Sequence, residues 1–227
     1  MNNTLKSELN KIYNKVPAGD CTGCANCCQE SVGASFAEAQ VIFENIKKMP
    51  QLKRSKLLER IFEYYFEIYQ NRKKCPFLDE NKRCEIYDSR PLNCRLYGHW
   101  KEKEYNENYK RLYSENKEIK KIINEQYGYK INEDYVLFNI PYCKNFEGRL
   151  LSKHERNELY DELIVLDSKL FLKEGFEMAY EDKGIVEHIV DKLLSKEKIF
   201  DLKMKGKLSK KMKCRLIKLA RLRIGAM

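Results

Sequence analysis

Apolar residues recur at helical spacing along most of the chain. Between about Leu52 and Lys73, large aliphatic and aromatic side chains return every three or four residues. This spacing predicts an amphipathic helix whose aromatic stripe packs in the core. Ser35 is followed three residues later by Glu38, which is the pattern of a capping box, and Pro50 closes the same segment. A helix is therefore expected between Ser35 and Pro50.

The remaining pattern is also helical, with two interruptions. Ser152 and Glu155 form a second capping-box pattern, which predicts a helix to about Lys173. Strand patterns are weak and short, and prolines and spaced cysteines break the helical pattern in residues 74–99 and 128–143. We predict a mostly α-helical single domain with an irregular cysteine-rich core and a basic C-terminal helix. Further helices are expected near residues 3–15, 100–127, 183–196 and 205–223.

Charge divides the chain into two parts. Residues 1–195 hold 32 lysines and arginines and 32 acidic residues, whereas residues 196–227 hold 12 against two, so the formal excess of +10 lies in the last segment. We therefore predict a helical metal-binding domain over 1–195 and a basic amphipathic extension over 196–227. The extension is expected to dock by an apolar stripe, with nucleic acid, an acidic partner or anionic lipid as alternative contacts. That stripe comprises Leu208, Met212, Leu216 and Leu219.

Hydropathy and cysteine content indicate the compartment. No segment reaches the apolar length of a membrane span, and the polar N-terminus lacks the apolar stretch of a secretory signal. These features predict a cytoplasmic protein. Because cytosolic thiols are kept reduced, nine cysteines, an odd number, favour metal binding over disulfides or isolated reactive thiols.

The cysteines show metal-ligand spacing. Residues 21–28 read CTGCANCC, in which C-x2-C is typical of zinc sites and C-x2-C-x2-C resembles the run that bacterial ferredoxins use for iron–sulfur clusters. The side chains of adjacent Cys27 and Cys28 point apart, so we expect two nearby centres or one multinuclear centre. Cys214, in the basic segment, is interpreted as a spare thiol. The expected ligands are Cys21, Cys24, Cys27, Cys28, Cys75, Cys84, Cys94 and Cys143.

Three residues near Cys94 are candidates for the surroundings of the metal. Arg90 and Arg95 flank Cys94 and could donate hydrogen bonds to its sulfur, with solvated surface charges as the alternative. His99 could replace a cysteine ligand, although eight thiolates already complete two sites. No catalytic acid, base or nucleophile stands out, so the residues leave open whether the protein is an enzyme.

The motifs C-x-G-C-x-x-C-C, C-P-F-L and C-x-I-Y-x-x-R-P-x-x-C-R resemble those of the CxxCxxCC zinc- or iron-chelating domain family, the YkgJ-type cysteine-cluster proteins. The resemblance covers about residues 17–100, with Cys143 as the eighth cysteine. The resemblance includes Tyr87, which we group with Arg90, Arg95 and His99 around the ligands. Residues 96–99 depart from the family pattern, so the role of His99 stays open. The resemblance implies a metal- or cluster-binding protein. A more distant similarity to flagellin lysine N-methylases adds methyl transfer from S-adenosylmethionine as an alternative.

Three functions follow as hypotheses. The first is a cytosolic protein that holds iron–sulfur clusters, of the 4Fe-4S type, on eight cysteines and has a redox or cluster-dependent enzymatic role. The second is a zinc-stabilised interaction module whose basic segment binds nucleic acid or another partner. The third is S-adenosylmethionine-dependent methyl transfer. Iron–sulfur is favoured over zinc because the cysteine triplet matches ferredoxin runs, whereas structural zinc usually uses separate C-x2-C pairs.

Overall fold

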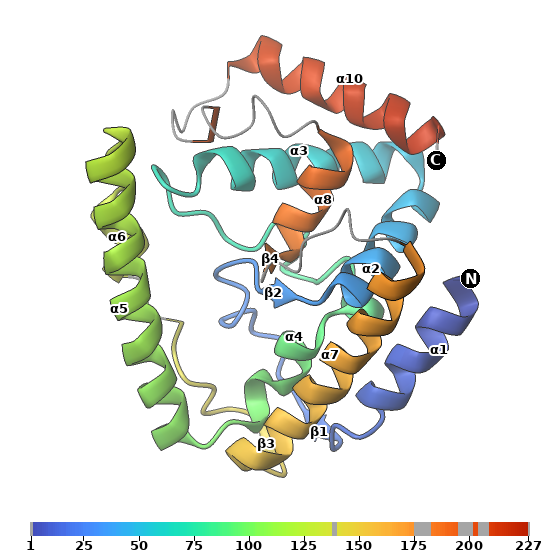
Figure 1. Ribbon diagram of the computed structural model, residues 1–227, viewed down its shortest axis with the longest axis vertical. Coiled ribbons are helices and arrows are strands. Elements are labelled where there is room, and N and C mark those ends of the chain that lie inside the picture. Colours follow the sequence, from blue (N-terminus) through green and yellow to red (C-terminus); the bar gives the residue numbers. More distant parts are fainter. Residues whose placement is uncertain (1, 138–139, 175–182, 195–201, 204–208, 227) are drawn as a thin grey trace.

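Helices account for most of the chain (Figure 1). The computed structural model describes residues 2–137, 140–174, 183–194, 202–203 and 209–226. Single turns of 3-10 helix, η1 (Tyr87–Ser89) and η2 (Tyr97–His99), flank the fourth helix. The mostly α-helical fold expected from the sequence is confirmed. The helices are α1 (Asn2–Tyr13), α2 (Phe36–Lys48), α3 (Gln51–Glu67), α4 (Leu92–Leu96), α5 (Glu102–Tyr127), α6 (Glu133–Leu137), α7 (Lys153–Glu174), α8 (Ile185–Leu193) and α10 (Lys210–Ala226).

Two very small antiparallel sheets bracket the first cysteine loop. Strand β1 (Gly19–Asp20) pairs with β3 (Glu147–Gly148), and β2 (Gly33–Ala34) pairs with β4 (Lys183–Gly184). The CTGCANCC segment lies between β1 and β2, so each side of the loop is tied to a distant part of the chain. Strands of two residues carry no alternating pattern, which explains why they were not expected individually.

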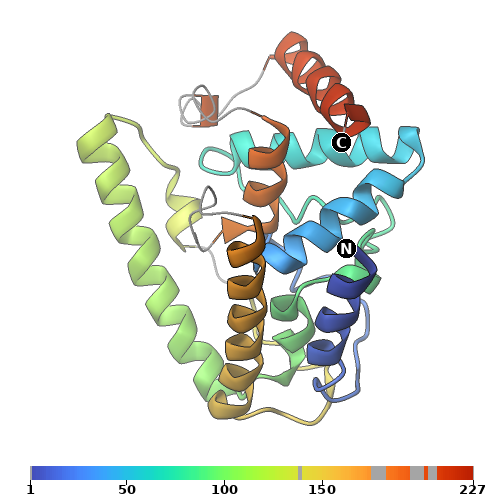
Figure 2. The same cartoon turned by 45° about the vertical axis from the view of Figure 1, so that its right-hand side comes forward.

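The larger core forms around α3. Its aromatic and aliphatic stripe, including Leu57, Phe62 and Phe66, has no exposed surface. Helices α8 and α10 pack on α3, and both ribbon views show α10 lying along it (Figures 1 and 2). Helix α3 ends at Glu67, earlier than the expected Lys73, and the following residues turn towards the cysteine-bearing insert.

The docking of the C-terminal helix differs in detail from the expected stripe. Leu216, Ala220 and Ile224 are buried against the core, whereas Leu219 is 43% exposed. Leu216, Ala220 and Ile224 share one face at steps of four residues, and Leu219 lies to the side of that face. Met212 is half-buried beside this face, and Leu208 lies outside the described residues.

A second hydrophobic core holds α4 in position. Apolar residues of α1, α2 and α7 surround Leu92 and Leu96 of α4, which have no exposed surface. The Ser35 capping box is present at the start of α2, and the backbone N–H groups of Phe36 and Ala37 donate to the carboxylate of Asp167 in α7. This buried carboxylate satisfies helix N–H groups that otherwise have no partner within α2.

The Ser152 capping box is also present. The backbone N–H of Ser152 donates to the Glu155 carboxylate, and the N–H of Glu155 donates to the Ser152 hydroxyl. Residues 74–99, expected to be irregular, include α4 and the two 3-10 turns, and residues 128–143 include α6. No helix in the described part of the chain is both long and apolar enough to span a membrane. The division at residue 195 stays a prediction.

Candidate metal centre

The CTGCANCC loop reverses direction twice. Gly23 and Ala25 both have positive φ angles, +66° and +57°, and the backbone N–H of Cys28 donates to the carbonyl of Ala25 at 3.0 Å. Glycine adopts this left-handed conformation without steric cost, whereas alanine at the same φ is strained. These reversals allow the sulfurs of a short loop to face different neighbours along its length.

The beginning of the loop lies near Cys143. The pairing of β1 with β3 places Gly19 opposite Gly148 and Asp20 opposite Glu147. Cys21 follows β1 directly, and Cys143 precedes β3 by four residues, so this short ladder brings the isolated cysteine to the first one. The family resemblance grouped Cys143 with the other cysteines, but the sequence contained no pattern for the strand pair that brings it there.

The end of the loop lies near the second cysteine group. The backbone N–H of Cys75 donates to the carbonyl of Cys28 at 3.0 Å. A turn follows in which Leu78 forms an isolated bridge with Cys84. The Asp79 carboxylate fixes this turn by accepting from the N–H groups of Asn81 and Arg83, both at 2.8 Å. Cys84 is thereby returned to the side of Cys75.

Cys94 is placed by a buried carboxylate. It lies on α4, and the backbone N–H of Leu92 at the start of α4 donates to the Glu38 carboxylate at 2.6 Å. The same carboxylate accepts from the Tyr13 hydroxyl at 2.9 Å and from the N–H of Ser35 at 2.9 Å. Glu38 therefore joins α1, α2 and α4, a role that its capping-box position did not predict.

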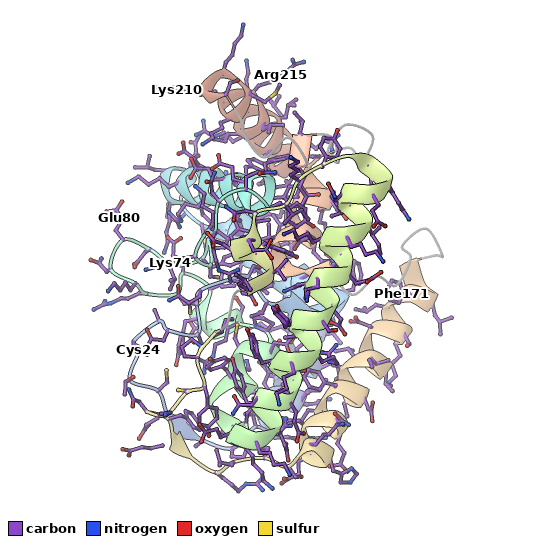
Figure 3. The ribbon with its side chains drawn as sticks, turned by 90° about the vertical axis from the view of Figure 1, so that its left-hand side faces the viewer. Cys24, Lys74, Glu80, Phe171, Lys210 and Arg215 are labelled. Atoms are coloured by element: carbon purple, nitrogen blue, oxygen red, sulfur yellow. The ribbon has the colours of Figure 1, made fainter. Side chains whose placement is uncertain are left out.

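A cavity of about 490 Å³ opens beside the cysteines. Its lining comes from the loop after β1, from α4 and η2, and from the segment before β3. Figure 3 shows Cys24 at the molecular surface, on the same side as Lys74 and Glu80. The cavity is lined by five of the expected ligands, Cys21, Cys24, Cys27, Cys94 and Cys143.

Four thiols act on one another electrostatically and line the cavity, and we call them the outer set. They are Cys21, Cys24, Cys27 and Cys143. Burial raises the pKa of Cys143, and charges on the other three thiols raise it further. Cys21 and Cys24 are exposed, whereas Cys27 and Cys143 are half-buried. The outer set therefore faces the cavity and solvent.

The other four thiols form the inner set: Cys28, Cys75, Cys84 and Cys94. Burial raises the pKa of Cys75 to about 12, with a contribution from Cys84. Burial also raises the pKa of Cys94, with contributions from Cys75 and Cys84. Each member is half-buried. Protein surrounds this set more closely than the outer set.

Cys27 and Cys28 connect the two sets. Their Sγ atoms lie 3.9 Å apart. The hydrogen bond from Cys28 lowers the pKa of Cys27 to about 7, while the same contact, burial and the charges of Cys75 and Cys94 raise the pKa of Cys28. Cys27 acts electrostatically on thiols of both sets, and the closeness of the two Sγ atoms differs from the expectation that these adjacent side chains point apart. The expectation of two centres stays a prediction.

All nine cysteines are free thiols. In the part of the chain that the structure describes, no three His, Cys, Asp or Glu side chains converge closely enough to hold a metal ion. The two sets are therefore neighbouring thiols rather than closed coordination shells. Cys214 is exposed on α10, on the helix that packs against α3, and lines no part of this cavity.

Arg90 is the cation nearest to both sets. Beside the larger effects of burial and neighbouring thiols, its charge acts to lower the pKa of Cys27, Cys84 and Cys94. The Nε of Arg90 is buried without a hydrogen-bond partner, and its guanidinium lies 4.2 Å from the centre of the Tyr87 ring. A buried N–H donor without an acceptor, whose charge acts on three of the thiols, fits a site that gains negative charge.

Arg95 and His99 have different environments from Arg90. Arg95 donates to the carbonyls of Arg90 and Asp88 at 2.9 and 2.8 Å, so its hydrogen bonds brace the loop. His99 is buried and lines the cavity, and its Nδ1 lies 2.7 Å from the carbonyl oxygen of Arg149. Because a carbonyl oxygen only accepts, Nδ1 donates this hydrogen bond.

Sequence reasoning missed the aromatic support of the outer set. The ring of Phe146 stacks edge-on against His99, with ring centres 4.6 Å apart. A Cβ atom at Gly19, Gly98 or Gly148 would lie within 3 Å of this ring, so three glycines create its space. Their scattered positions form no motif. The hydroxyls of Tyr97 and Tyr105 donate to the carbonyls of Pro141 and Ile140, which ties the segment before Cys143 to η2 and α5.

The model of one protein family matches this chain. It is the CxxCxxCC family, described as "Putative zinc- or iron-chelating domain", and it matches residues 20–112. The match confirms the family resemblance and indicates a metal-chelating domain for zinc or iron. It includes seven of the eight expected ligands and leaves out Cys143. No curated protein and no solved structure matches the chain. The more distant similarity to flagellin lysine N-methylases stays a prediction.

Proposed function

We propose that this protein holds two iron–sulfur clusters, one on the outer set and one on the inner set, and that it functions in electron transfer or cluster-dependent chemistry. The observation that supports two centres best is the grouping of thiols around the adjacent pair Cys27 and Cys28. Charges on Cys21 and Cys24 act with that of Cys27 on Cys143, charges on Cys75 and Cys94 act on Cys28, and Cys27 is a neighbour of both groups.

The number of thiols suits two four-ligand centres. Four thiolates satisfy a tetrahedral zinc ion or a four-iron cluster. In two-cluster ferredoxins, the first three cysteines of the run bind one cluster and the fourth binds the other. The same division applies here, since Cys21, Cys24 and Cys27 belong to the outer set and Cys28 to the inner set. The ferredoxin-like spacing and the spatial grouping therefore support the same assignment.

Hydrogen-bond acceptors, rather than net charge, favour a cluster over a simple ion. Four thiolates with zinc carry about −2, as does an oxidised four-iron cluster with its thiolates. Cluster sulfides offer additional acceptors for N–H groups, and such hydrogen bonds tune the reduction potential. Arg90 has a buried N–H without a partner and acts electrostatically on members of both sets. We assign it as the donor to sulfur.

An iron–sulfur cluster supplies one-electron chemistry, and the chain determines its surroundings. The inner set is half-buried and reaches the cavity only through Cys94, whereas all four thiols of the outer set line the cavity and two of them are exposed. Solvent exposure and hydrogen bonding are two of the factors that set cluster potentials. The two centres are therefore expected to differ in potential. His99 and Arg95 line the cavity beside the outer set, where they position the backbone rather than bind iron.

Metal and sulfide analysis after anaerobic purification tests the proposal. Two four-iron clusters give about eight irons and about eight acid-labile sulfides per chain, together with a brown colour. About two zinc ions per chain without sulfide would contradict the iron–sulfur assignment and favour the zinc alternative.

Single substitutions test the division between the sets. In Cys28→Ser the inner centre is lost and about half of the iron remains, and in Cys24→Ser the outer centre is lost with the same remaining fraction. Cys214→Ser is the matched control, since it removes an exposed thiol outside both sets and should retain the full iron content. Loss of all iron in Cys28→Ser and in Cys24→Ser would indicate a single multinuclear centre instead.

A further inference from the structure

The surface of helix α10 is strongly positive. Between Lys210 and Ala226 it carries seven lysines and arginines and no acidic residue. Lys213 pairs with Glu63 and Glu67 of α3, at 2.6 and 3.3 Å. The other six basic residues are exposed, and none forms an ion pair within the described residues. They are Lys210, Lys211, Arg215, Lys218, Arg221 and Arg223.

The packing of α10 orients these charges outward. Leu216 and Ala220 are buried against the core, and Lys213 is held on the same side by its acidic partners. Lys211, Arg215 and Lys218 are spaced by four and three residues, so they share one face of the helix, opposite the buried one. Figure 3 shows Lys210 and Arg215 projecting from the top of the molecule.

The helix α5 provides a contrast within the same chain. Its 26 residues carry six basic and six acidic residues, and some of them pair along the helix, as Arg111 does with Glu115. An exposed helix of this protein can therefore have balanced charge. The excess of positive charge on α10 is therefore a local feature, and packing on the core fixes the orientation of this helix.

We propose that the outward face of α10 binds the phosphate backbone of duplex DNA. Six exposed cations on one fixed helix complement a regular array of phosphates, and such contacts supply most of the sequence-independent affinity of DNA-binding proteins. The B-form major groove admits an α-helix, whereas the major groove of duplex RNA is deep and narrow. The face lacks aromatic residues, on which single-stranded nucleic acids usually stack.

The packing of α10 disfavours two other partners. A membrane-surface helix buries its apolar face among lipids, but that face of α10 is already docked on α3 and α8. The leucines left outside it, Leu219 and Leu222, are 43% and 62% exposed. Protein interfaces are enriched in Trp, Tyr and Arg at their centres, and α10 offers arginines but no aromatic residue.

Fluorescence anisotropy with a labelled 20-base-pair DNA duplex tests the proposal on the full-length, metal-loaded protein. If three or four of the six cations contact phosphates, affinity should fall roughly 40- to 150-fold between 50 and 200 mM salt. Duplex RNA, single-stranded DNA and vesicles containing anionic lipid serve as competitors. Absence of binding at 50 mM salt, or tighter binding to any of these competitors, would overturn the proposal.

A matched pair of triple variants locates the surface. Lys211→Ala/Arg215→Ala/Lys218→Ala should lower the affinity for duplex DNA at least about tenfold. It should also make the slope of log affinity against log salt concentration shallower, by the amount expected for about three lost phosphate contacts. Lys103→Ala/Lys110→Ala/Lys121→Ala removes the same charge from exposed positions of α5 and should change affinity less than about twofold. Equal losses in both variants would show general charge attraction and refute a site on α10. The readout does not depend on the metal, so it stands apart from the proposed clusters.

Discussion

The outer and inner cysteine sets contain the same ligand type in two different environments. The outer set lies on a strained loop and beside a cavity, with two thiols exposed. The inner set is held by backbone hydrogen bonds of Cys75 and by α4, whose start is fixed by the buried Glu38. The difference shows that the surroundings of a thiol, rather than its identity, decide how accessible it is to solvent.

Removal of metal should separate the two sets most clearly. We expect a chelator to extract metal in two phases, with complete loss of the outer centre before the inner one, because the thiols of the outer set are more accessible. Absorbance of the clusters during chelation measures this order. Cys28→Ser, which keeps only the outer centre, should retain the fast phase alone. A single phase in the unchanged protein would show that the sets are not independent.

Substitution of Glu38 should weaken the inner set more than the outer one. Glu38→Ala leaves the buried Tyr13 hydroxyl and the Leu92 N–H without their acceptor, at a cost of about 3 kcal/mol in the free energy of unfolding. Urea denaturation of the metal-free protein measures this cost, and iron content reports the inner centre. Glu44→Ala, at a half-buried position on the same helix, is the control and should cost less than about 1 kcal/mol.

Substitution of Gly98 should affect the outer set. The Cβ atom in Gly98→Ala would lie 2.3 Å from the Phe146 ring, which also contacts His99 and the other two glycines. Overpacking of this kind costs about 1–3 kcal/mol. Thermal unfolding and the rate of the fast chelation phase measure it. Gly225→Ala is the control, since nothing lies within 4 Å of its added Cβ. Equal stability of the two variants would contradict the support assigned to Phe146.

Alkaline pH should destabilise the metal-free, reduced protein through the inner set. Burial raises the pKa of Cys75 from 9.0 to about 12. Above pH 9 the unfolded thiol loses its proton while the folded thiol keeps it, so stability falls as the pH rises from 9 to 12. One such thiol lowers the free energy of unfolding by about 1 kcal/mol at pH 10.

Urea denaturation at pH 8 and pH 10 measures this change. Cys75→Ser should reduce the difference between the two pH values, whereas Cys21→Ser, at an exposed position, should leave it unchanged. Metal binding should show the opposite trend, with affinity rising with pH because thiols bind metals only after losing a proton.

Local patterns in the sequence predicted most of the helices. The apolar spacing of α3, the capping boxes at Ser35 and Ser152, and the long charged α5 depend on residues within a few positions of one another. Helix ends were less accurate, as α3 shows, because the turn after Glu67 responds to distant contacts. The short helices α4 and α6 were missed since a single turn has too few positions to show a period.

The sequence by itself determined that residues 20–112 resemble the CxxCxxCC family and that the chain is mostly helical. Only the tertiary structure decided which thiols are neighbours, because the placing of Cys143 on the same cavity as Cys21 depends on a two-residue strand pair without a sequence pattern. It also decided that Glu38 fixes α4 and that Arg90 presents an unpaired N–H near both sets. Such contacts join residues far apart in the chain, where short-range patterns carry no information.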